Sequence, residues 1–210
     1  MNQKKQHWQT IYETKTPQEV SWTQAKPQIS LDFIASFNLE KTAKIIDVGG
    51  GESLLVDFLL EDGFMDITVL DISSTALEKS KERVEEKFAE KPNYKANFVT
   101  WIESDITDFE PKTNFDLWHD RATFHFLTEE SDISKYVKTV EKCVSKNLII
   151  ATFSKEGAKK CSGLEICQYN EESLMNKFEV SFKKISCLQE DHTTPFDTQQ
   201  NFLFCGFEKI

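Results

Sequence analysis

Apolar and polar positions alternate along the chain in blocks that predict strands and helices in turn. Short apolar runs have the length and composition of buried strands, and the segments between them repeat apolar residues with helical spacing. Strands that alternate with helices predict an α/β fold with a parallel sheet and right-handed crossovers. The predicted strands are residues 43–48, 66–70, 97–102, 115–118 and 148–153, and the predicted helices are 31–37, 53–62, 74–89 and 131–144.

The carboxyl-terminal part of the chain departs from this alternation. Segments 180–189 and 200–208 both have strand composition, and residues Asp191–Thr198 lie between them. Because a helix does not fit in that gap, we expect the two strands to pair antiparallel as a hairpin. The expected fold is therefore a Rossmann-like, seven-stranded sheet with helices on both faces, parallel apart from an antiparallel carboxyl-terminal hairpin.

The chain has 210 residues and contains no internal repeat, low-complexity segment or flexible linker. We expect one domain over residues 1–210, with an aromatic amino-terminal segment over residues 1–30 and a core over residues 31–210. The helix predicted over 74–89 carries interspersed opposite charges, which is typical of a solvent-exposed face. We assign that helix no functional residue.

The charge balance restricts the partners. The chain has 25 Lys and Arg against 35 Asp and Glu, for a formal net charge of −10. An acidic surface argues against a nucleic-acid partner, because phosphate binding needs a basic face. No apolar run is long enough to span a membrane, and the polar start has no signal-peptide pattern. We expect a cytoplasmic protein with no membrane partner.

The chain has five cysteines, an odd number, and none of them forms a CxxC pair. We expect free thiols, several on buried strands, with no disulfide framework and no metal site. The five are Cys143, Cys161, Cys167, Cys187 and Cys205.

A glycine-rich turn follows the first predicted strand and is the strongest functional signal. Asp47 ends an apolar run that leads into Gly49, Gly50 and Gly51, and Asp71 ends the next strand. Glycines let a ligand approach the backbone closely, and a strand-end carboxylate accepts hydrogen bonds from ribose hydroxyls. The pattern predicts a nucleoside site at the carboxyl edge of the sheet.

The turn departs from the motifs of two other nucleotide sites. The third small position of the dinucleotide fingerprint is Leu54, and no Gly-Lys-Ser/Thr sequence is present to form a P-loop. Asp71 does not separate NAD from S-adenosylmethionine, because both contain a ribose diol. Another carboxylate, Asp105, lies in Glu103-Ser104-Asp105-Ile106 directly after the third predicted strand. An Asp at such a position can be part of a binding site, or it can simply cap a turn.

Together, Asp47-Val48-Gly49-Gly50-Gly51-Glu52-Ser53, Asp71 and Asp105 resemble the motifs of class I S-adenosylmethionine-dependent methyltransferases. The resemblance implies S-adenosylmethionine as cofactor and S-adenosylhomocysteine as product. It implies that Asp71 binds the ribose, that Asp105 faces the adenine amino group, and that Ile72 and Ile106 contact the adenine. In that family the backbone at the end of the fourth strand, here near His119, meets the methionine part. Ser53 stands where the family often has glycine.

The whole chain is similar to the compact single-domain methyltransferases of bacteria, and more loosely to thiopurine S-methyltransferases. The second similarity rests on the aromatic amino-terminal segment, the closing strand pair and a turn read as Trp118-His119-Asp120-Arg121. It implies that Arg121 lies near the acceptor.

The candidate catalytic residues are Asp120, Arg121 and His192. Histidine titrates near neutral pH and can act as a base or as a hydrogen-bond donor. Each candidate has a structural alternative: Asp120 and Arg121 can form an ion pair that stiffens the turn, and His192 can be an ordinary loop residue. His125, between two phenylalanines, has the sequence context of a buried structural histidine.

The polar segment around Trp22 and Gln24 predicts that this part of the chain forms a lid over the cofactor. The alternative is that Trp8, Tyr12 and Trp22 only pack against one edge of the domain. The expected function is methyl transfer to a sulfur, nitrogen or oxygen of a small-molecule acceptor. Two alternatives are a protein-lysine methyltransferase and a non-catalytic protein that binds S-adenosylmethionine. The Asn/Asp-Pro-Pro-Tyr/Phe signature of amide and adenine modifiers is missing after the fourth strand.

Overall fold

The computed structural model describes residues 3–210 and divides the chain into two compact units. The first unit runs to Asp108 and the second covers Phe109–Ile210. The strands of both units belong to one seven-stranded sheet, in the order β3-β2-β1-β4-β5-β9-β8. This order confirms the predicted Rossmann-like methyltransferase sheet. The prediction of a single domain stays a prediction.

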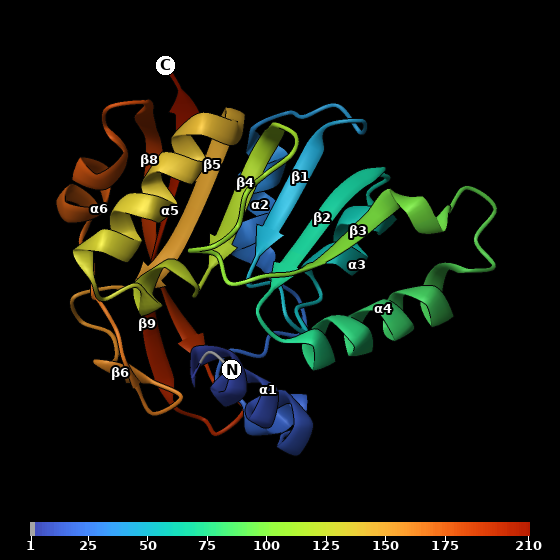
Figure 1. Cartoon of the computed structure of the whole chain (residues 1–210), viewed down its shortest axis with the longest axis horizontal. Coiled ribbons are helices and arrows are strands. Elements are labelled where there is room, and N and C mark those ends of the chain that lie inside the picture. The colour runs from blue at the N-terminus through green and yellow to red at the C-terminus, as the bar shows by residue number, and fades with distance from the viewer. Residues whose placement is uncertain (1–2) are drawn as a thin grey trace. The chain divides into compact units, whose positions relative to one another are not determined.

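The first unit holds three parallel strands and their connecting helices (Figure 1). β2 lies between β1 and β3, and its register places Leu70 beside Val48 and Asp71 beside Glu103. The carboxyl ends of all three strands therefore lie level, as a site built from strand ends requires. The elements are α1 (Gln3–Thr14), η1 (Pro17–Glu19), α2 (Gln28–Ser36), β1 (Lys44–Val48), α3 (Leu55–Glu61), β2 (Asp66–Asp71), α4 (Ser74–Phe88), η2 (Ala96–Phe98) and β3 (Val99–Glu103).

The second unit continues with a parallel pair and closes with antiparallel strands. β4 pairs parallel with β5, β5 pairs antiparallel with β9, and β9 pairs antiparallel with β8. The carboxyl-terminal hairpin is thereby confirmed. The elements are β4 (Phe115–Arg121), η3 (Phe124–Phe126), α5 (Glu130–Cys143), β5 (Val144–Phe153), β6 (Lys160–Cys161), β7 (Leu164–Glu165), α6 (Glu171–Phe178), β8 (Phe182–Thr193) and β9 (Gln199–Lys209).

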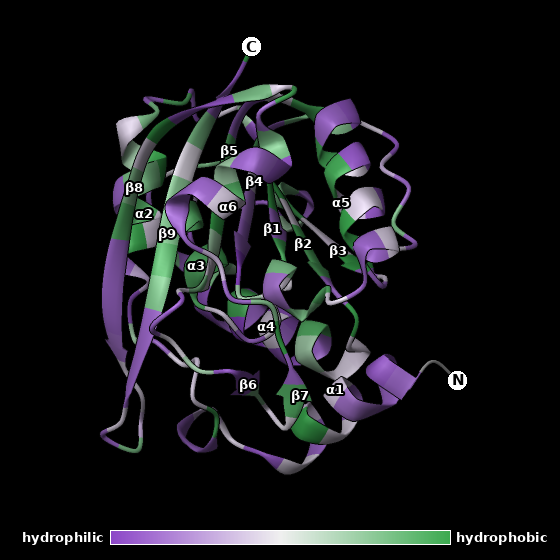
Figure 2. Ribbon diagram, turned by 90° about the vertical axis from the view of Figure 1, so that its left-hand side faces the viewer, coloured by the Kyte–Doolittle hydropathy of each residue, from purple (hydrophilic) through white to green (hydrophobic). Residues whose placement is uncertain are grey.

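The hydropathy of the closing hairpin explains which strand lies inside. The middle of β9 is buried from Phe202 to Phe207, whereas most of β8 is exposed. Figure 2 shows the same contrast, with green predominating in the middle of β9 and purple along much of β8. β9 lies between β5 and β8 and packs on both faces, so its apolar run is continuous.

The spacing of apolar residues along the sequence did not predict two of the helices. α1 has a polar composition and buries only Ile11 and Tyr12, and it contacts α4. α6 begins at a cap in which the Asn170 side chain accepts from the backbone N–H of Ser173 at 2.8 Å. Both helices have too few buried positions to give a helical apolar pattern, so tertiary packing decides them.

β4 and β8 continue several residues beyond their predicted carboxyl ends, and this changes the placement of three site residues. β4 continues to Arg121, so His119 and Asp120 are buried strand residues, and the expected turn at Trp118 is wrong. β8 continues to Thr193, so His192 lies on a strand and not in the hairpin loop. Polar residues were taken as loop signals, but here they occur in strands that are partly covered.

The expectation of five free thiols is wrong for two of them. Cys187 and Cys205 are directly opposite in the β8–β9 register and form a disulfide. Opposed residues of antiparallel strands come close enough for such a bond, and only the register reveals the pairing. Cys143, Cys161 and Cys167 are free.

Two further features concern residues 3–210. None of the helices there combines the length and the apolar character needed to cross a membrane. In the same residues, no group of three or more His, Cys, Asp or Glu side chains is arranged to hold a metal ion.

Candidate active site

The glycine turn after β1 is held against the end of β2. The backbone N–H groups of Gly49 and Gly50 both donate to the Leu70 carbonyl, at 2.7 and 3.2 Å. Gly49 has a φ of 67°, which favours glycine. A Cβ at Gly50 would lie 2.6 Å from Val69 Cγ1 and 2.9 Å from Asp47 Oδ2. The turn is therefore packed on one side by its own strands.

Asp71 ends β2 with its carboxylate buried beside this turn. Its Oδ1 accepts from the backbone N–H of Ser73 at 2.8 Å. Burial raises the pKa of Asp71 to about 7, and the negative charge of Asp47 adds to the rise. Hydrogen bonds from the backbone N–H groups of Ser73 and Gly51 lower the pKa and offset part of the rise that burial causes. A buried carboxylate whose pKa is perturbed by its surroundings marks a functional site.

The first helix covers the turn from the side. A Cβ at Gly51, where φ is 47°, would collide with the Tyr12 hydroxyl and lie 3.3 Å from Asp71 Oδ2. Lys79 donates to the Tyr12 carbonyl at 2.6 Å, and the Ser73 hydroxyl donates to Gln9 Oε1 at 3.0 Å. α1 is thus fixed over α4 and the Asp71 carboxylate, a role that the sequence pattern did not reveal.

The predicted lid residue Trp22 follows α1 in the chain and packs against two aromatic residues of that helix. Its ring meets Trp8 edge-on at 5.8 Å and Tyr12 at 6.3 Å between centroids. This contact agrees with the packing alternative, and a moving lid stays a prediction.

α4 also holds the glycine turn, although its charges predicted only a solvated face. Ser80 donates to the Gly51 carbonyl at 2.6 Å, and Arg83 Nη2 donates to the Ser53 carbonyl at 2.8 Å. Arg83 is itself fixed by the buried Asp57 at 2.9 Å. These three side chains orient carbonyl groups of the turn and leave its N–H groups to other partners.

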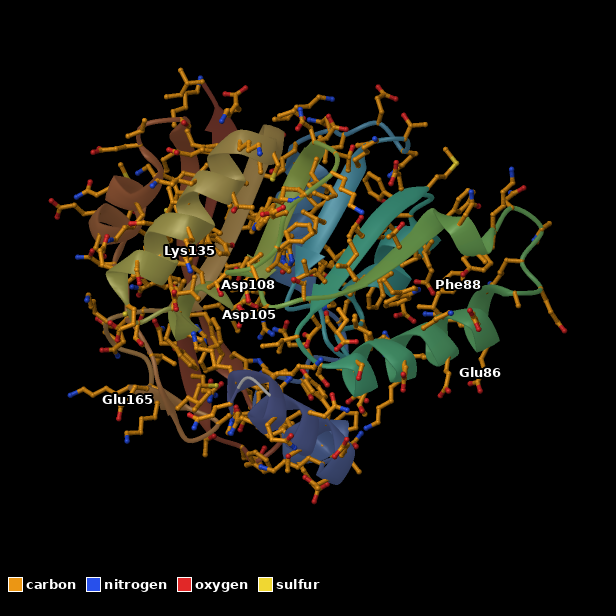
Figure 3. The ribbon with its side chains drawn as sticks, viewed as in Figure 1. Glu86, Phe88, Asp105, Asp108, Lys135 and Glu165 are labelled. Carbon is orange, nitrogen blue, oxygen red and sulfur yellow. A yellow bond between two sulfur atoms is a disulfide. The ribbon has the colours of Figure 1, made fainter. Side chains whose placement is uncertain are left out.

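The loop after β3 holds Asp105 in a local turn. Asp105 Oδ1 accepts from the backbone N–H and the hydroxyl of Thr107, at 3.0 and 2.8 Å. Asp105 and Asp108 lie close together in this loop (Figure 3). Ile106 is buried and Ile72 half-buried. The turn cap that was the alternative for Asp105 is present, and its contact with adenine stays a prediction.

In the second unit, Asp120 is the centre of a buried hydrogen-bond network. Its carboxylate accepts from the Tyr136 hydroxyl at 2.6 Å and from the backbone N–H groups of Thr123 and Phe124 at 2.9 and 3.2 Å. Trp118 Nε1 donates to Tyr136 at 2.9 Å. Burial raises the pKa of Asp120 to about 6, against the lowering effect of Tyr136. These contacts shape the turn after β4, and a catalytic role for Asp120 stays a prediction.

Arg121 and His192 come together around one phenylalanine of β9. The Arg121 guanidinium lies 5.0 Å from the centre of the Phe202 ring, and the His192 ring meets Phe202 edge-on at 6.3 Å. The residue that follows Arg121, Ala122, has a φ of 72°, which is unusual for a residue with a Cβ. His119, from the same strand, is buried.

The first unit holds two parts that a nucleoside site needs, a glycine turn and a buried carboxylate at the end of the neighbouring strand. Gly50 and Gly51 lie where a Cβ would collide with neighbouring atoms, and the Asp71 carboxylate lies at the same turn. This arrangement, with its β-α-β topology, defines a nucleoside-binding α/β protein of the class I methyltransferase type.

Comparison with known proteins agrees with this class. Residues 46–147 match the sequence model of a family described as a methyltransferase domain. No curated protein matches the chain. Residues 46–147 therefore form a methyltransferase domain, and the chain has the fold of class I S-adenosylmethionine-dependent methyltransferases.

Several solved structures share the fold. A protein studied for the conversion of a disulfide bond into a thioacetal group in echinomycin biosynthesis has a TM-score of 0.77 and 13% identity, over 98% of this chain and 92% of that one. A Burkholderia thailandensis 1,6-didemethyltoxoflavin-N1-methyltransferase has a TM-score of 0.72 and 13% identity, over 98% of this chain and 86% of that one. The magnesium protoporphyrin IX methyltransferase of Synechocystis, with bound S-adenosylmethionine, has a TM-score of 0.66 and 13% identity, over 100% of this chain and 92% of that one. Identities this low support the fold alone, and the thiopurine similarity stays a prediction.

We expect the affinity for S-adenosylmethionine to rise with pH up to about 7 and then level off. Burial raises the pKa of Asp71 to about 7, and ribose hydroxyls bind its ionised form best. At pH 6 roughly a tenth of an acid with that pKa is ionised, so the dissociation constant should be about tenfold higher than at pH 8. Calorimetry at pH 6, 7 and 8 measures this change.

The control for this pH dependence is Asp71→Asn, whose weaker binding should lack the Asp71 titration. The stability of the free protein should change the opposite way. Because the folded pKa exceeds the ordinary value of 3.8, the contribution of Asp71 to stability is full below 3.8 and is lost as pH rises through about 7. Equal affinity of the parent protein at pH 6 and 8 would contradict the assignment of the ribose to Asp71.

Proposed function

We propose that this methyltransferase binds S-adenosylmethionine at the glycine turn and methylates a heteroatom of a small-molecule acceptor. The observation that carries the proposal is the buried Asp71 carboxylate beside Gly51, with a backbone N–H donor on one oxygen. The cofactor supplies a methyl group on a sulfonium, which is already activated for transfer.

The cofactor-binding roles fall to residues of the first unit. Asp71 accepts from the ribose hydroxyls, and Gly49, Gly50 and Gly51 provide backbone at the turn. Asp47 supports the turn from β1. Further proposed cofactor contacts are Ile72, Asp105, Ile106, Trp22 and, from the second unit, His119.

The acceptor-side roles fall to residues of the second unit. Arg121 and His192 both contact Phe202, and we assign them to acceptor binding or proton transfer. The contacts of Asp120 support a positioning role, because its carboxylate holds Thr123 and Phe124 in the turn. Methyl transfer from a sulfonium needs mainly alignment and exclusion of water, so a strong base is not required.

A small-molecule acceptor has support from the structural neighbours. One is a 1,6-didemethyltoxoflavin-N1-methyltransferase with bound 1,6-didemethyltoxoflavin, and another is named for magnesium protoporphyrin IX. The alternatives are a protein-lysine acceptor, for which the acidic net charge of −10 suits a basic target, and binding without catalysis.

The test is calorimetric titration with S-adenosylmethionine, S-adenosylhomocysteine and NAD, followed by transfer of labelled methyl groups. We expect micromolar binding of both adenosyl ligands and none of NAD, with label entering low-molecular-weight acceptors. Label that enters only a lysate protein would favour the lysine alternative. Binding without any transfer would favour the non-catalytic one, and binding of NAD alone would overturn the proposal.

A further inference from the structure

One group of side chains in the second unit buries polar atoms without hydrogen-bond partners. Within the described residues, no partner exists for either ring nitrogen of His125, for Glu190 Oε2 or for Gln200 Oε1. A buried polar atom without a hydrogen bond destabilises the folded state, and native proteins keep few of them. A cluster of them therefore needs an explanation, and a ligand that supplies the missing hydrogen bonds is one.

The three side chains converge on the aromatic surface around Phe202. Glu190 is directly opposite Phe202 in the β8–β9 register, and Gln200 lies two residues before Phe202, on the same face of the strand. The centre of the His125 ring lies 6.5 Å from that of Phe202. It also stacks on Phe153 at 4.8 Å with an interplanar angle of 14°. The polar atoms thus border a surface made of ring faces.

The charge state of the group decides what it binds. Burial and the positive charge of Arg121 lower the pKa of His125 to about 3, so its imidazole is neutral near pH 7. Burial raises the pKa of Glu190, and Arg121 lowers it. Because the Arg121 charge offsets the Glu190 carboxylate, the group has no excess positive charge to attract an anion.

The hydrogen-bonding inventory then points to a ligand that both donates and accepts. Glu190 Oε2 and Gln200 Oε1 accept only, and a neutral imidazole has one acceptor and one donor nitrogen. Arg121, whose guanidinium lies 5.0 Å from the centre of the Phe202 ring, only donates. A group that holds both acceptors and donors favours a ligand that carries N–H and carbonyl groups together. The ring faces of Phe153 and Phe202 favour a planar one.

We propose that His125, Glu190 and Gln200 form the acceptor-recognition site and select an uncharged, planar nitrogen heterocycle that presents ring N–H and carbonyl groups. This assignment rests on the proposed function and adds the class of the acceptor. The sequence analysis did not single out Glu190 and Gln200, and it favoured a structural role for His125. The signal of all three is the loss of hydrogen bonds on burial, which a sequence does not display.

The test uses lumazine, a flat bicyclic heterocycle with ring N–H groups, against 1,3-dimethyllumazine, which has the same ring with two N–H groups capped. Binding to the full chain saturated with S-adenosylhomocysteine is followed by ligand-observed NMR. We expect lumazine to bind at least about tenfold more tightly, the effect of one hydrogen bond to a charged group. Naphthoate, a planar anion, should bind more weakly than lumazine.

Two variants assign the preference to the named side chains. Glu190→Met and Gln200→Met remove the oxygens at similar length, and each should reduce the lumazine preference about tenfold without changing S-adenosylhomocysteine binding. Glu208→Met, on the exposed end of β9, is the matched control and should keep the preference. Thermal melting of each variant checks that it folds.

The outcomes separate this inference from the proposed function. If S-adenosylhomocysteine fails to bind the parent protein, the proposed function fails. If it binds but lumazine does not, or if both lumazines or naphthoate bind equally well, the acceptor class is wrong. If the preference survives both substitutions in folded protein, the heterocycle is recognised elsewhere and the site assignment is overturned.

Discussion

Replacing Asp71 by alanine should raise the dissociation constant for S-adenosylmethionine at least about 100-fold. Two ribose hydroxyls would lose a charged acceptor, and hydrogen bonds to charged groups contribute about 1.5–3 kcal/mol each. The folded protein should survive the change, because burial already makes the ionised Asp71 costly and raises its pKa to about 7. Calorimetry at pH 8 measures the affinity, and thermal melting measures the stability.

The matched control is Asp62→Ala. Asp62 is an exposed carboxylate of the same unit, paired at the surface with Lys41 at 2.7 Å. Surface ion pairs contribute about 0–1 kcal/mol, so both affinity and melting temperature should stay near those of the parent protein. Normal binding by folded Asp71→Ala protein would show that the ribose does not lie at the end of β2.

Among the substitutions considered, replacing Asp120 by alanine should lower the free energy of unfolding the most. The change leaves the Tyr136 hydroxyl and the backbone N–H groups of Thr123 and Phe124 without their acceptor. At about 1–3 kcal/mol for each buried orphan, the total is about 3–5 kcal/mol after partial relaxation. Thermal melting should show a fall of about 10 °C or more.

Asp120→Asn separates positioning from catalysis. The amide oxygen still accepts from the two backbone N–H groups, and the Tyr136 hydroxyl can turn to accept from the amide nitrogen. We therefore expect most of the stability and most of the methyl transfer to return. Full stability with transfer reduced by several orders of magnitude would instead mean that the carboxylate takes part in the chemistry.

The glycine turn and the class of fold could be predicted because local chemistry specifies them. Gly49 and Gly51 adopt backbone conformations that favour glycine, and the apolar runs of β1 and β2 identify buried parallel strands. Asp71 could be placed at the end of β2 because it directly follows an apolar run with strand composition. The hairpin followed from a connection too short for a helix.

The extent of β4 and β8 could not be predicted, because polar residues in a strand look like a loop until the covering elements are known. His119 and Asp120 are buried in β4, and His192 is buried near the end of β8. The Cys187–Cys205 bond depends on the register of two strands, which single positions do not encode.

The sequence by itself determined the α/β fold, the glycine turn and the carboxylate at the end of β2. These features depend on neighbouring residues and on hydrophobic period, which a chain displays directly. Only the tertiary structure decided that Tyr12 covers Gly51 and that Glu190, Gln200 and His125 meet around Phe202. Those contacts join residues far apart in the chain, so burial and lost hydrogen bonds become visible only after folding.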